Sequence, residues 1–335
     1  MRQIQITSPG GLENLSLCEV EWPRPKPNEV VVKIAASSLN YHDLMVALGL
    51  IPTDDKRVPL SDAAGEVVEV GSEVLEWRTG DHVMSVCFPN WQSGPPRADL
   101  LSFIGDHQDG YATEYIAIPA TALTRIPGNL NLTEAATLPC AGLTAWRALV
   151  DEGNLEAGQT VLVQGSGGVS VFALQIAKSL GARVIATSSS AEKLEKLSAL
   201  GADELVNYKE NPQWGREVLA KTGNEGVDHI VEVGGGGTFG ESVRCAKLGG
   251  HIALIGVLSG PAVSEIILPR IFLKQIRLSG IAMANRQSQV EMIKHIEEVG
   301  INPVISDHFD LAKLAEAFQH QIDNKHFGKI SITME

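Results

Sequence analysis

The residues best suited to chemistry form a glycine-rich turn, GSGGVS, at 165–170. An apolar run at 161–164 precedes the turn, and an apolar helical segment follows it. A strand, a tight turn and a helix in this order direct backbone N–H groups and the positive end of the helix dipole at a pyrophosphate. The motif predicts dinucleotide binding, with an ordinary structural turn as the alternative. The residues expected at the phosphates are Gly165, Ser166, Gly167, Gly168 and Val169.

This motif departs from the dinucleotide fingerprint at one position. Gly165 permits the tight turn, and Gly167 lets the backbone approach the ligand without a Cβ in the way. The fingerprint has a third glycine where the helix packs closely on the strand, and this chain has Ser170 there. Serine is small, so we expect the packing to tolerate it.

The second strand of this region ends in hydroxyl side chains rather than in a carboxylate. An NAD-preferring site usually has Asp or Glu there, but the nearest acid is Glu192, inside the next helix. Ser188, Ser189 and Lys193 suit an added 2′-phosphate, and Tyr208 at the end of the third strand could bind the adenosine end. The pattern favours NADP(H) over NAD. Alternatively, Ser188 to Ser190 only cap the helix and Lys193 is a solvated surface residue.

Two more glycine clusters follow the fourth and fifth strands of the same region. Ligands of open parallel sheets bind beyond the carboxyl ends of the strands, where residues 234–237 and the pair at 256–257 lie. We therefore expect Gly234, Gly256 and Val257 to approach the cofactor. For the run at 234–237, a mobile glycine loop is the alternative.

A parallel sheet must position these motifs. After residue 155, short apolar runs bounded by glycine alternate with helical segments, which is typical of a parallel sheet covered on both faces. The strands are expected at 161–164, 183–187, 204–208, 228–233, 251–257 and 275–282. The region is thus predicted to be a doubly wound α/β fold of the Rossmann type.

The first 125 residues have a different character, rich in proline, glycine and short β-like runs. Examples of such runs are 30–35, 65–70 and 115–118. Many short strands with frequent turns predict a barrel-like or irregular β domain. The end of the chain adds helical stretches at 287–299 and 311–324 and a short strand at 329–333.

The composition excludes several classes of protein. The chain has 335 residues, 27 basic and 40 acidic, and a net charge of −13, which argues against nucleic acid or an anionic membrane as the main partner. No apolar stretch approaches the ~18 residues that span a bilayer, and the N-terminus lacks the apolar core of a secretory signal. We expect a soluble, cytoplasmic protein of about two domains.

The four cysteines are spaced too widely for a metal knuckle or a disulfide framework. They are Cys18, Cys87, Cys140 and Cys245. Cys140 follows a proline at the start of an apolar helical segment, where we expect it to pack as a small hydrophobic residue.

Taken together, the motifs resemble those of the medium-chain dehydrogenase/reductase superfamily over nearly the whole chain. They are LNYHD at 39–43, DAAG at 62–65, GDHV at 80–83, AATLPCAGLTA at 135–145 and the glycine turn. The resemblance implies a GroES-like β-rich catalytic domain formed by 1–126 and 281–335, interrupted by an NAD(P)-binding Rossmann domain at 127–280. It also implies a homodimer, through a sheet edge near 263–268, and a cofactor contact at Thr144.

Many members of the superfamily are zinc-dependent alcohol dehydrogenases. In those members a cysteine stands in place of Asn40, a His-Glu pair in place of Ser61 and Asp62, and a second cysteine near Cys140. Asparagine and serine are poor substitutes for thiolate and imidazole around Zn²⁺. The segment 89–108, which corresponds to the structural-zinc lobe, contains no cysteine. We therefore expect no zinc.

The zinc-free quinone oxidoreductases and enone reductases are the branch that the chain resembles most. The resemblance implies NADPH-dependent hydride transfer to a quinone or an α,β-unsaturated carbonyl. Asn40 would orient the nicotinamide ribose or a substrate oxygen, and Tyr41 or else His42 would donate a proton. Asp43, the third residue of this candidate catalytic set, would make a structural hydrogen bond rather than act as a base. The alternatives are an alcohol dehydrogenase or carbonyl reductase with a non-standard metal site, and a non-catalytic NADPH-binding protein.

Overall fold

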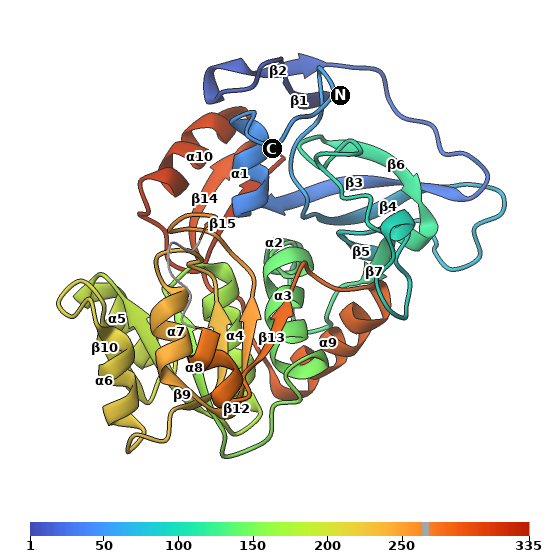
Figure 1. Cartoon of the computed structure of the whole chain (residues 1–335). Helices are drawn as coiled ribbons and strands as arrows, with labels where there is room; N and C mark the ends of the chain where they lie inside the picture. Colours follow the sequence, from blue (N-terminus) through green and yellow to red (C-terminus); the bar gives the residue numbers. More distant parts are fainter. Residues whose placement is uncertain (263–267, 335) are drawn as a thin grey trace. The chain divides into compact units, whose positions relative to one another are not determined.

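The computed structural model describes residues 1–262 and 268–334 (Figure 1). By its internal contacts the chain divides into two compact units. The first unit comprises Met1–Leu143 and Met283–Glu335, and the second comprises Thr144–Ala282. The first unit is therefore discontinuous in sequence. These contacts group residues 127–143 with the first unit. The domain boundaries expected above, at 126/127 and 280/281, follow the superfamily's pattern and stay a prediction.

The described residues of the second unit form a six-stranded parallel sheet in the order β10-β9-β8-β11-β12-β13. The strands are β8 (Thr160–Gln164), β9 (Arg183–Ser188), β10 (Glu204–Asn207), β11 (Val227–Glu232), β12 (Ala246–Leu254) and β13 (Arg277–Gly280). The helices are α4 (Gly168–Ser179), α5 (Ala191–Ala199), α6 (Trp214–Lys221), α7 (Phe239–Cys245) and α8 (Leu268–Leu273), while α3 (Leu143–Trp146) contains the point of division. The strand order reverses between β8 and β11, the usual ligand position in such folds. The expected Rossmann sheet is confirmed.

The described residues of the first unit form a sheet in the order β14-β15-β3-β4-β5-β7, with β6 also paired to β3. Its strands are β3 (Glu29–Ser38), β4 (Ala64–Val70), β5 (His82–Ser85), β6 (Tyr115–Pro119), β7 (Leu123–Arg125), β14 (Ile305–Asp310) and β15 (Lys329–Thr333), beside a separate pair β1 (Arg2–Ile6) and β2 (Leu15–Glu19). The helices are α1 (Tyr41–Ala47), α2 (Leu132–Ala135), α9 (Arg286–Val299) and α10 (Leu314–Ile322). This is the expected GroES-like β domain.

Strand β3 connects the distant parts of the first unit. Its apolar run is buried on both faces, and it pairs antiparallel with β4, β6 and β15. The pairing of Ser38 with Ser331 brings the last strand of the chain beside the residues just before α1 (Figure 1). Strand β14 was not expected from the sequence because it is a half-exposed edge strand whose residues are mostly polar.

Among the described residues, none of the helices has the length and apolar character needed to cross a membrane. The sheet edge expected to form a dimer, 263–268, lies outside the described residues except for Leu268.

Two buried histidines face each other in the second unit. His229 on β11 and His251 on β12 are register partners, and their rings are 5.7 Å apart, edge to face. The Nε2 atom of His229 lies 2.9 Å from Gln159 Oε1, whereas neither ring nitrogen of His251 has a partner among the described residues. Burial lowers the pKa of each imidazole to about 4.

This pair predicts that acid destabilises the second unit. The unfolded chain binds these protons with an ordinary pKa near 6.5, so the unfolded state takes up protons as the pH falls from about 6.5 to 4. The contribution of this pair to the free energy of unfolding should be constant above about pH 7 and fall below it, by up to about 3 kcal/mol for each histidine. His251→Leu should flatten this decline in denaturant unfolding, whereas His82→Gln, at an exposed position, should not. An unchanged pH profile in His251→Leu would contradict the prediction.

Candidate functional site

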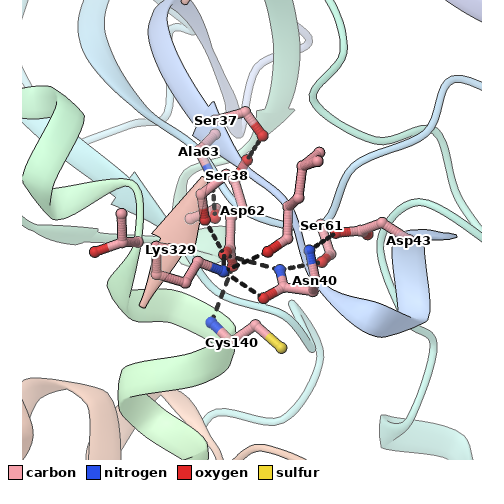
Figure 2. Close-up of polar contacts among 12 residues, drawn as sticks. Ser37, Ser38, Asn40, Asp43, Ser61, Asp62, Ala63, Cys140 and Lys329 are labelled. Carbon is pink, nitrogen blue, oxygen red and sulfur yellow. Dashed lines mark hydrogen bonds and ion pairs between the residues drawn. The ribbon is translucent and has the colours of Figure 1, made fainter. Parts of the chain in front are cut away.

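The polar centre of the first unit is the carboxylate of Asp62, which is entirely buried. Its Oδ2 atom accepts hydrogen bonds from Ser38 Oγ at 2.7 Å and from Asn40 Nδ2 at 2.9 Å. Its Oδ1 atom accepts the backbone N–H of Cys140 at 2.9 Å (Figure 2). Donors on both oxygens satisfy the hydrogen-bonding capacity of a carboxylate that water cannot reach.

The cation beside this carboxylate is Lys329, the first residue of β15, which is only 3% exposed. Its Nζ atom donates to Leu39 O at 2.7 Å and to Asn40 Oδ1 at 2.6 Å, and it lies 3.3 Å from Asp62 Oδ2. These contacts use all three N–H bonds of the ammonium group. We call Ser38, Asn40, Ser61, Asp62, Cys140 and Lys329 the Asp62 cluster.

Asn40 is held from several sides within this cluster. Its Nδ2 atom donates to Asp62 and, at 3.2 Å, to Ser61 Oγ, while its Oδ1 atom accepts from Lys329. Its backbone N–H donates to Asp43 Oδ2 at 3.0 Å. Both amide N–H bonds are therefore used inside the protein. The predicted role of Asn40 toward a ribose or a substrate stays a prediction, and it would have to use the second lone pair of the amide oxygen, because Lys329 already donates to that atom.

Asp43 is a second buried acid, at the start of α1. Burial, followed by the charge of Asp62, raises its pKa to about 6. Its hydrogen bond to the Asn40 backbone fixes the first turn of α1. This contact is of the structural kind that we expected for Asp43.

Tyr41 and His42 lie in the first turn of α1, where the backbone is fixed by Asn40 and Asp43. The Tyr41 side chain is 38% exposed. His42 packs edge-on against Phe103, and its Nε2 atom lies 2.9 Å from Asp106 Oδ2. Burial would by itself raise the pKa of Asp106, but hydrogen bonds from His42 and His107 hold it below its ordinary value. Sequence reasoning missed Asp106 because it comes from a distant loop.

Cys140 lies in a π-helical turn, Leu138–Gly142, and its side chain is 9% exposed. It packs with Cys87, Phe88, Trp91 and Phe103, as a small hydrophobic residue would. Its contribution to the Asp62 cluster is its backbone N–H rather than its thiol.

In the second unit, the glycine turn joins the end of β8 to α4, with Gly167 as the N-cap of the helix. Gly165 has a φ of 74°, in the left-handed region that favours glycine. A Cβ at Gly165 or Gly167 would meet no heavy atom of the described residues within 4 Å, so these glycines are not explained by packing of the chain on itself. Ser170 replaces the third glycine and donates from Oγ to Gln164 O at 2.6 Å, which ties the helix to the strand.

The glycines after β11 and β12 have a different basis. A Cβ at Gly234 would lie 2.2 Å from Thr238 Oγ1, one at Gly236 would lie 2.1 Å from Ala262 O, and one at Gly256 would lie 2.4 Å from Val233 O. At Gly236 and Gly256 the two loops therefore pack so closely that side chains do not fit, whereas at Gly234 a side chain would collide with Thr238 of the same loop. The expected cofactor contacts of Gly234, Gly256 and Val257 stay predictions.

A buried acid that sequence reasoning missed organises these loops. Glu232, at the end of β11, is entirely buried. It accepts hydrogen bonds from the N–H groups of Gly234 and Gly235 at 2.9 and 3.0 Å and from Gln164 Nε2 at 2.8 Å. The hydroxyls of Thr238 and Ser242 also donate to it. One carboxylate thus connects the end of β8 to the glycine loop and α7.

Of the residues expected at the adenosine end, Ser188 ends β9, Ser189 and Tyr208 follow β9 and β10, and Lys193 lies in the first turn of α5. The backbone N–H of Tyr208 donates to Ser188 O at 3.2 Å. The Ser188 side chain is buried, Ser189 and Lys193 are partly exposed, and burial lowers the pKa of the Lys193 ammonium group. Glu192 contacts Lys196 at 2.6 Å.

The structure also describes Ser190, next to the serines at the end of β9, and Thr144, whose expected cofactor contact stays a prediction. Ser190 caps α5 by accepting the N–H of Lys193 at 3.3 Å, so helix capping is confirmed for this serine. Thr144, in α3, is 3% exposed.

Comparisons with known proteins identify the family. Residues 26–128 match the family model of the alcohol dehydrogenase GroES-like domain, and residues 168–298 match that of zinc-binding dehydrogenases. A zinc-type alcohol dehydrogenase-like protein of Schizosaccharomyces pombe is 38% identical over 97% of this chain and 96% of its own length. This chain belongs to the medium-chain dehydrogenase/reductase superfamily. It is an oxidoreductase of that superfamily.

Other similar proteins are named for different substrates. A chloroplast envelope quinone oxidoreductase homologue of Arabidopsis thaliana is 31% identical over 96% of this chain and 95% of its own length. An acryloyl-coenzyme A reductase of Metallosphaera sedula is 29% identical over 97% and 98%. Among solved structures, an NAD-dependent alcohol dehydrogenase is 32% identical, covers both chains completely and has a TM-score of 0.91.

The residues of the Asp62 cluster do not fit a zinc ion, although one matching family model is named for zinc. Of the three positions that carry zinc ligands in metal-dependent members, Asn40 and Ser61 offer neither thiolate nor imidazole. The amide oxygen of Asn40 is already bound to the Lys329 ammonium group. No group of three or more His, Cys, Asp or Glu side chains within the described part of the chain is arranged to hold a metal ion.

Proposed function

We propose that the protein is an NADPH-dependent reductase that transfers a hydride, without zinc, to a quinone or to the C=C bond of an α,β-unsaturated carbonyl compound. The observation that carries the proposal is the Asp62 cluster, in which Asn40 and Ser61 stand at positions that carry zinc ligands in metal-dependent members, and the Asn40 amide oxygen accepts from Lys329. The reductases among the relatives support the choice of substrate class. Oxidation of an alcohol is disfavoured because the donor set of this cluster does not fit the Lewis acid that is the usual means of stabilising the alkoxide.

The second unit supports the cofactor part of the proposal. When bound, NADPH supplies the hydride. Residues 165–169 would hold its pyrophosphate against the N-terminus of α4, where open space lies before Gly165 and Gly167. Ser188, Ser189, Lys193 and Tyr208 would hold the 2′-phosphate. A relative with a similar fold is NAD-dependent, so the fold alone does not determine the preference for NADP over NAD. In this proposal, the residues at the end of β9 determine it.

The first turn of α1 supports a proton donor. Addition of hydride to the β-carbon of an enone leaves negative charge on the carbonyl oxygen and requires a proton at the α-carbon. The exposed phenol of Tyr41 could donate a hydrogen bond to that oxygen or supply the proton. His42, held by Asp106, is the alternative donor. The homodimer and the domain boundaries given above remain part of the proposal.

A substrate panel tests the proposed function. After dialysis against a chelator, NADPH oxidation should be fast with a quinone or an enone and negligible with a saturated ketone, because reduction of an activated C=C bond needs no metal. Absorbance at the reduced nicotinamide band measures the rate. Ketone reduction that is lost when the chelator removes bound zinc would support the alcohol dehydrogenase alternative instead. NADPH binding without turnover of any compound would indicate a non-catalytic protein.

Replacement of Lys193 tests the choice of cofactor. Lys193→Ala should raise KM for NADPH by about tenfold or more, because a charge-assisted contact to the 2′-phosphate is lost, and should change KM for NADH by less than about twofold. Lys196→Ala, one turn further along α5 and paired with Glu192, is the matched control and should affect neither cofactor. Equal losses for both cofactors in Lys193→Ala would remove the argument.

Replacement of Tyr41 tests the proton donor. Tyr41→Phe keeps the ring and removes the hydroxyl, so kcat should fall by about tenfold to a hundredfold while KM for NADPH stays unchanged. Tyr115→Phe, on β6, is the control for a tyrosine away from α1 and should retain activity. Full turnover in Tyr41→Phe would exclude the phenol and leave His42 as the candidate.

A further inference from the structure

We propose that Asp106 is a positioning residue that fixes the ring proton of His42 on Nε2, so that His42 Nδ1 supplies the proton that the substrate takes up during its reduction. The inference deepens the proposed function and rests on it for the substrate class. It gives the two candidate donors of α1 separate roles. The Tyr41 hydroxyl donates a hydrogen bond to the carbonyl oxygen, and His42 delivers the proton.

The backbone of its loop fixes the position of Asp106. The N–H of Ile104 donates to Cys87 O at 3.3 Å. The N–H of Gly105 donates to Gln108 O at 2.9 Å, and Gly105 has a φ of 95°, in the left-handed region that favours glycine. These contacts close a tight turn in which the Asp106 side chain is only 5% exposed, so its carboxylate meets protein groups rather than water.

The two carboxylate oxygens of Asp106 have different partners. Its Oδ1 atom accepts the backbone N–H of His107 and contacts Nδ1 of the same residue, while its Oδ2 atom lies 2.9 Å from His42 Nε2. Burial by itself would raise the pKa of Asp106, but the hydrogen bonds from His42 and His107 hold it below its ordinary value. Asp106 is therefore an ionised carboxylate at neutral pH, and such a group only accepts hydrogen bonds.

A partner that only accepts determines which ring nitrogen of His42 carries the proton. The hydrogen between Asp106 Oδ2 and His42 Nε2 must come from the imidazole, so neutral His42 has its proton on Nε2 and a lone pair on Nδ1. Within residues 1–262 and 268–334, no group forms a hydrogen bond with Nδ1, and the side chain of His42 is 33% exposed. His42 therefore gains and loses its second proton at Nδ1.

An aromatic contact fixes the plane of the same ring. Phe103 meets His42 edge to face, with ring centroids 4.4 Å apart and an angle of 77° between the planes. The hydrogen bond to Asp106 and this contact together leave the imidazole little freedom to turn. The other ionisable groups beside this pair are Asp43, buried on the same helix, and His107, on the far side of Asp106.

Reduction of an enone uses one proton for each hydride. The hydride forms a bond to the β-carbon, the π electrons move to the carbonyl oxygen, and the α-carbon then takes up a proton. In the proposed step the Nδ1–H bond of the His42 imidazolium breaks as a C–H bond forms at the α-carbon and the enolate returns to a carbonyl. With a quinone, an oxygen of the ring takes the proton instead. His42 is left neutral with its Nε2–H on Asp106, and it regains a proton from water at Nδ1.

Replacement of Asp106 tests this role in the enzyme. In Asp106→Asn the side chain keeps its size but can donate as well as accept, so it no longer holds the ring proton of His42 on Nε2. With an enone, kcat should fall by about tenfold or more while KM for NADPH changes by less than about twofold. Because Asp106 acts through His42, the double variant Asp106→Asn/His42→Ala should be no slower than His42→Ala alone.

Asp109→Asn is the matched control, since it removes another carboxylate of the same loop. Asp109 contacts Arg57 at 3.0 Å and makes no contact with His42, so this variant should keep the kcat of the wild type. Full kcat in Asp106→Asn would overturn the inference. So would a loss in the double variant that equals the product of the two single losses.

A second measurement needs neither turnover nor a variant of Asp106. In ¹⁵N NMR of protein labelled at the histidine rings, the His42 signals are those absent from His42→Ala. At alkaline pH, wild-type His42 should carry its proton on Nε2, and Asp106→Asn should show a mixture of both tautomers. A proton on Nδ1 in the wild type would overturn the inference even if Asp106→Asn does not fold. A protein that shows the Nε2 tautomer but turns over none of the panel compounds would disprove the proposed function and leave the positioning of His42 by Asp106 supported.

Discussion

A carboxylate withdrawn completely from water requires a counter-charge and a full set of hydrogen-bond donors, and the first unit is organised to give both to Asp62. The donors come from β3, from the start of α1 and from the π-helical turn around Cys140. The counter-charge comes from the far end of the sequence, through Lys329. Loss of any one contributor would leave a buried charge unsatisfied, so these segments depend on one another.

The same constraint determines where the reactive side chains of α1 lie. Lys329 holds the Leu39 carbonyl and the Asn40 amide, and Asp43 holds the Asn40 backbone. The next residues, Tyr41 and His42, begin α1 from a point that has little freedom to move. A buried ion pair with saturated hydrogen bonds can thus order the start of α1.

The second unit uses a comparable device for a different purpose. Glu232 gathers the first N–H groups of the glycine loop after β11, together with Gln164 at the end of β8. The loops after β11 and β12 pack so closely that side chains do not fit at Gly236 or Gly256. The turn at Gly165 and Gly167 is the opposite case, because open space lies where a Cβ would point. The two glycine clusters therefore have different physical bases: close packing of the chain after β11 and β12, and open space at the turn after β8.

The sequence by itself determined the two folds, the glycine turn and the lack of zinc-type side chains at Asn40 and Ser61, because these depend on local periodicity and residue type. It placed the last strand near its observed bounds but gave no reason to connect Lys329 with Asp62. Nor did it connect His42 with Asp106, or Glu232 with the glycine loop. Those contacts join residues that are distant in sequence or face one another across loops, and only sheet pairing and burial bring them together. The tertiary structure therefore decided which polar groups are satisfied, and with it the character of the site.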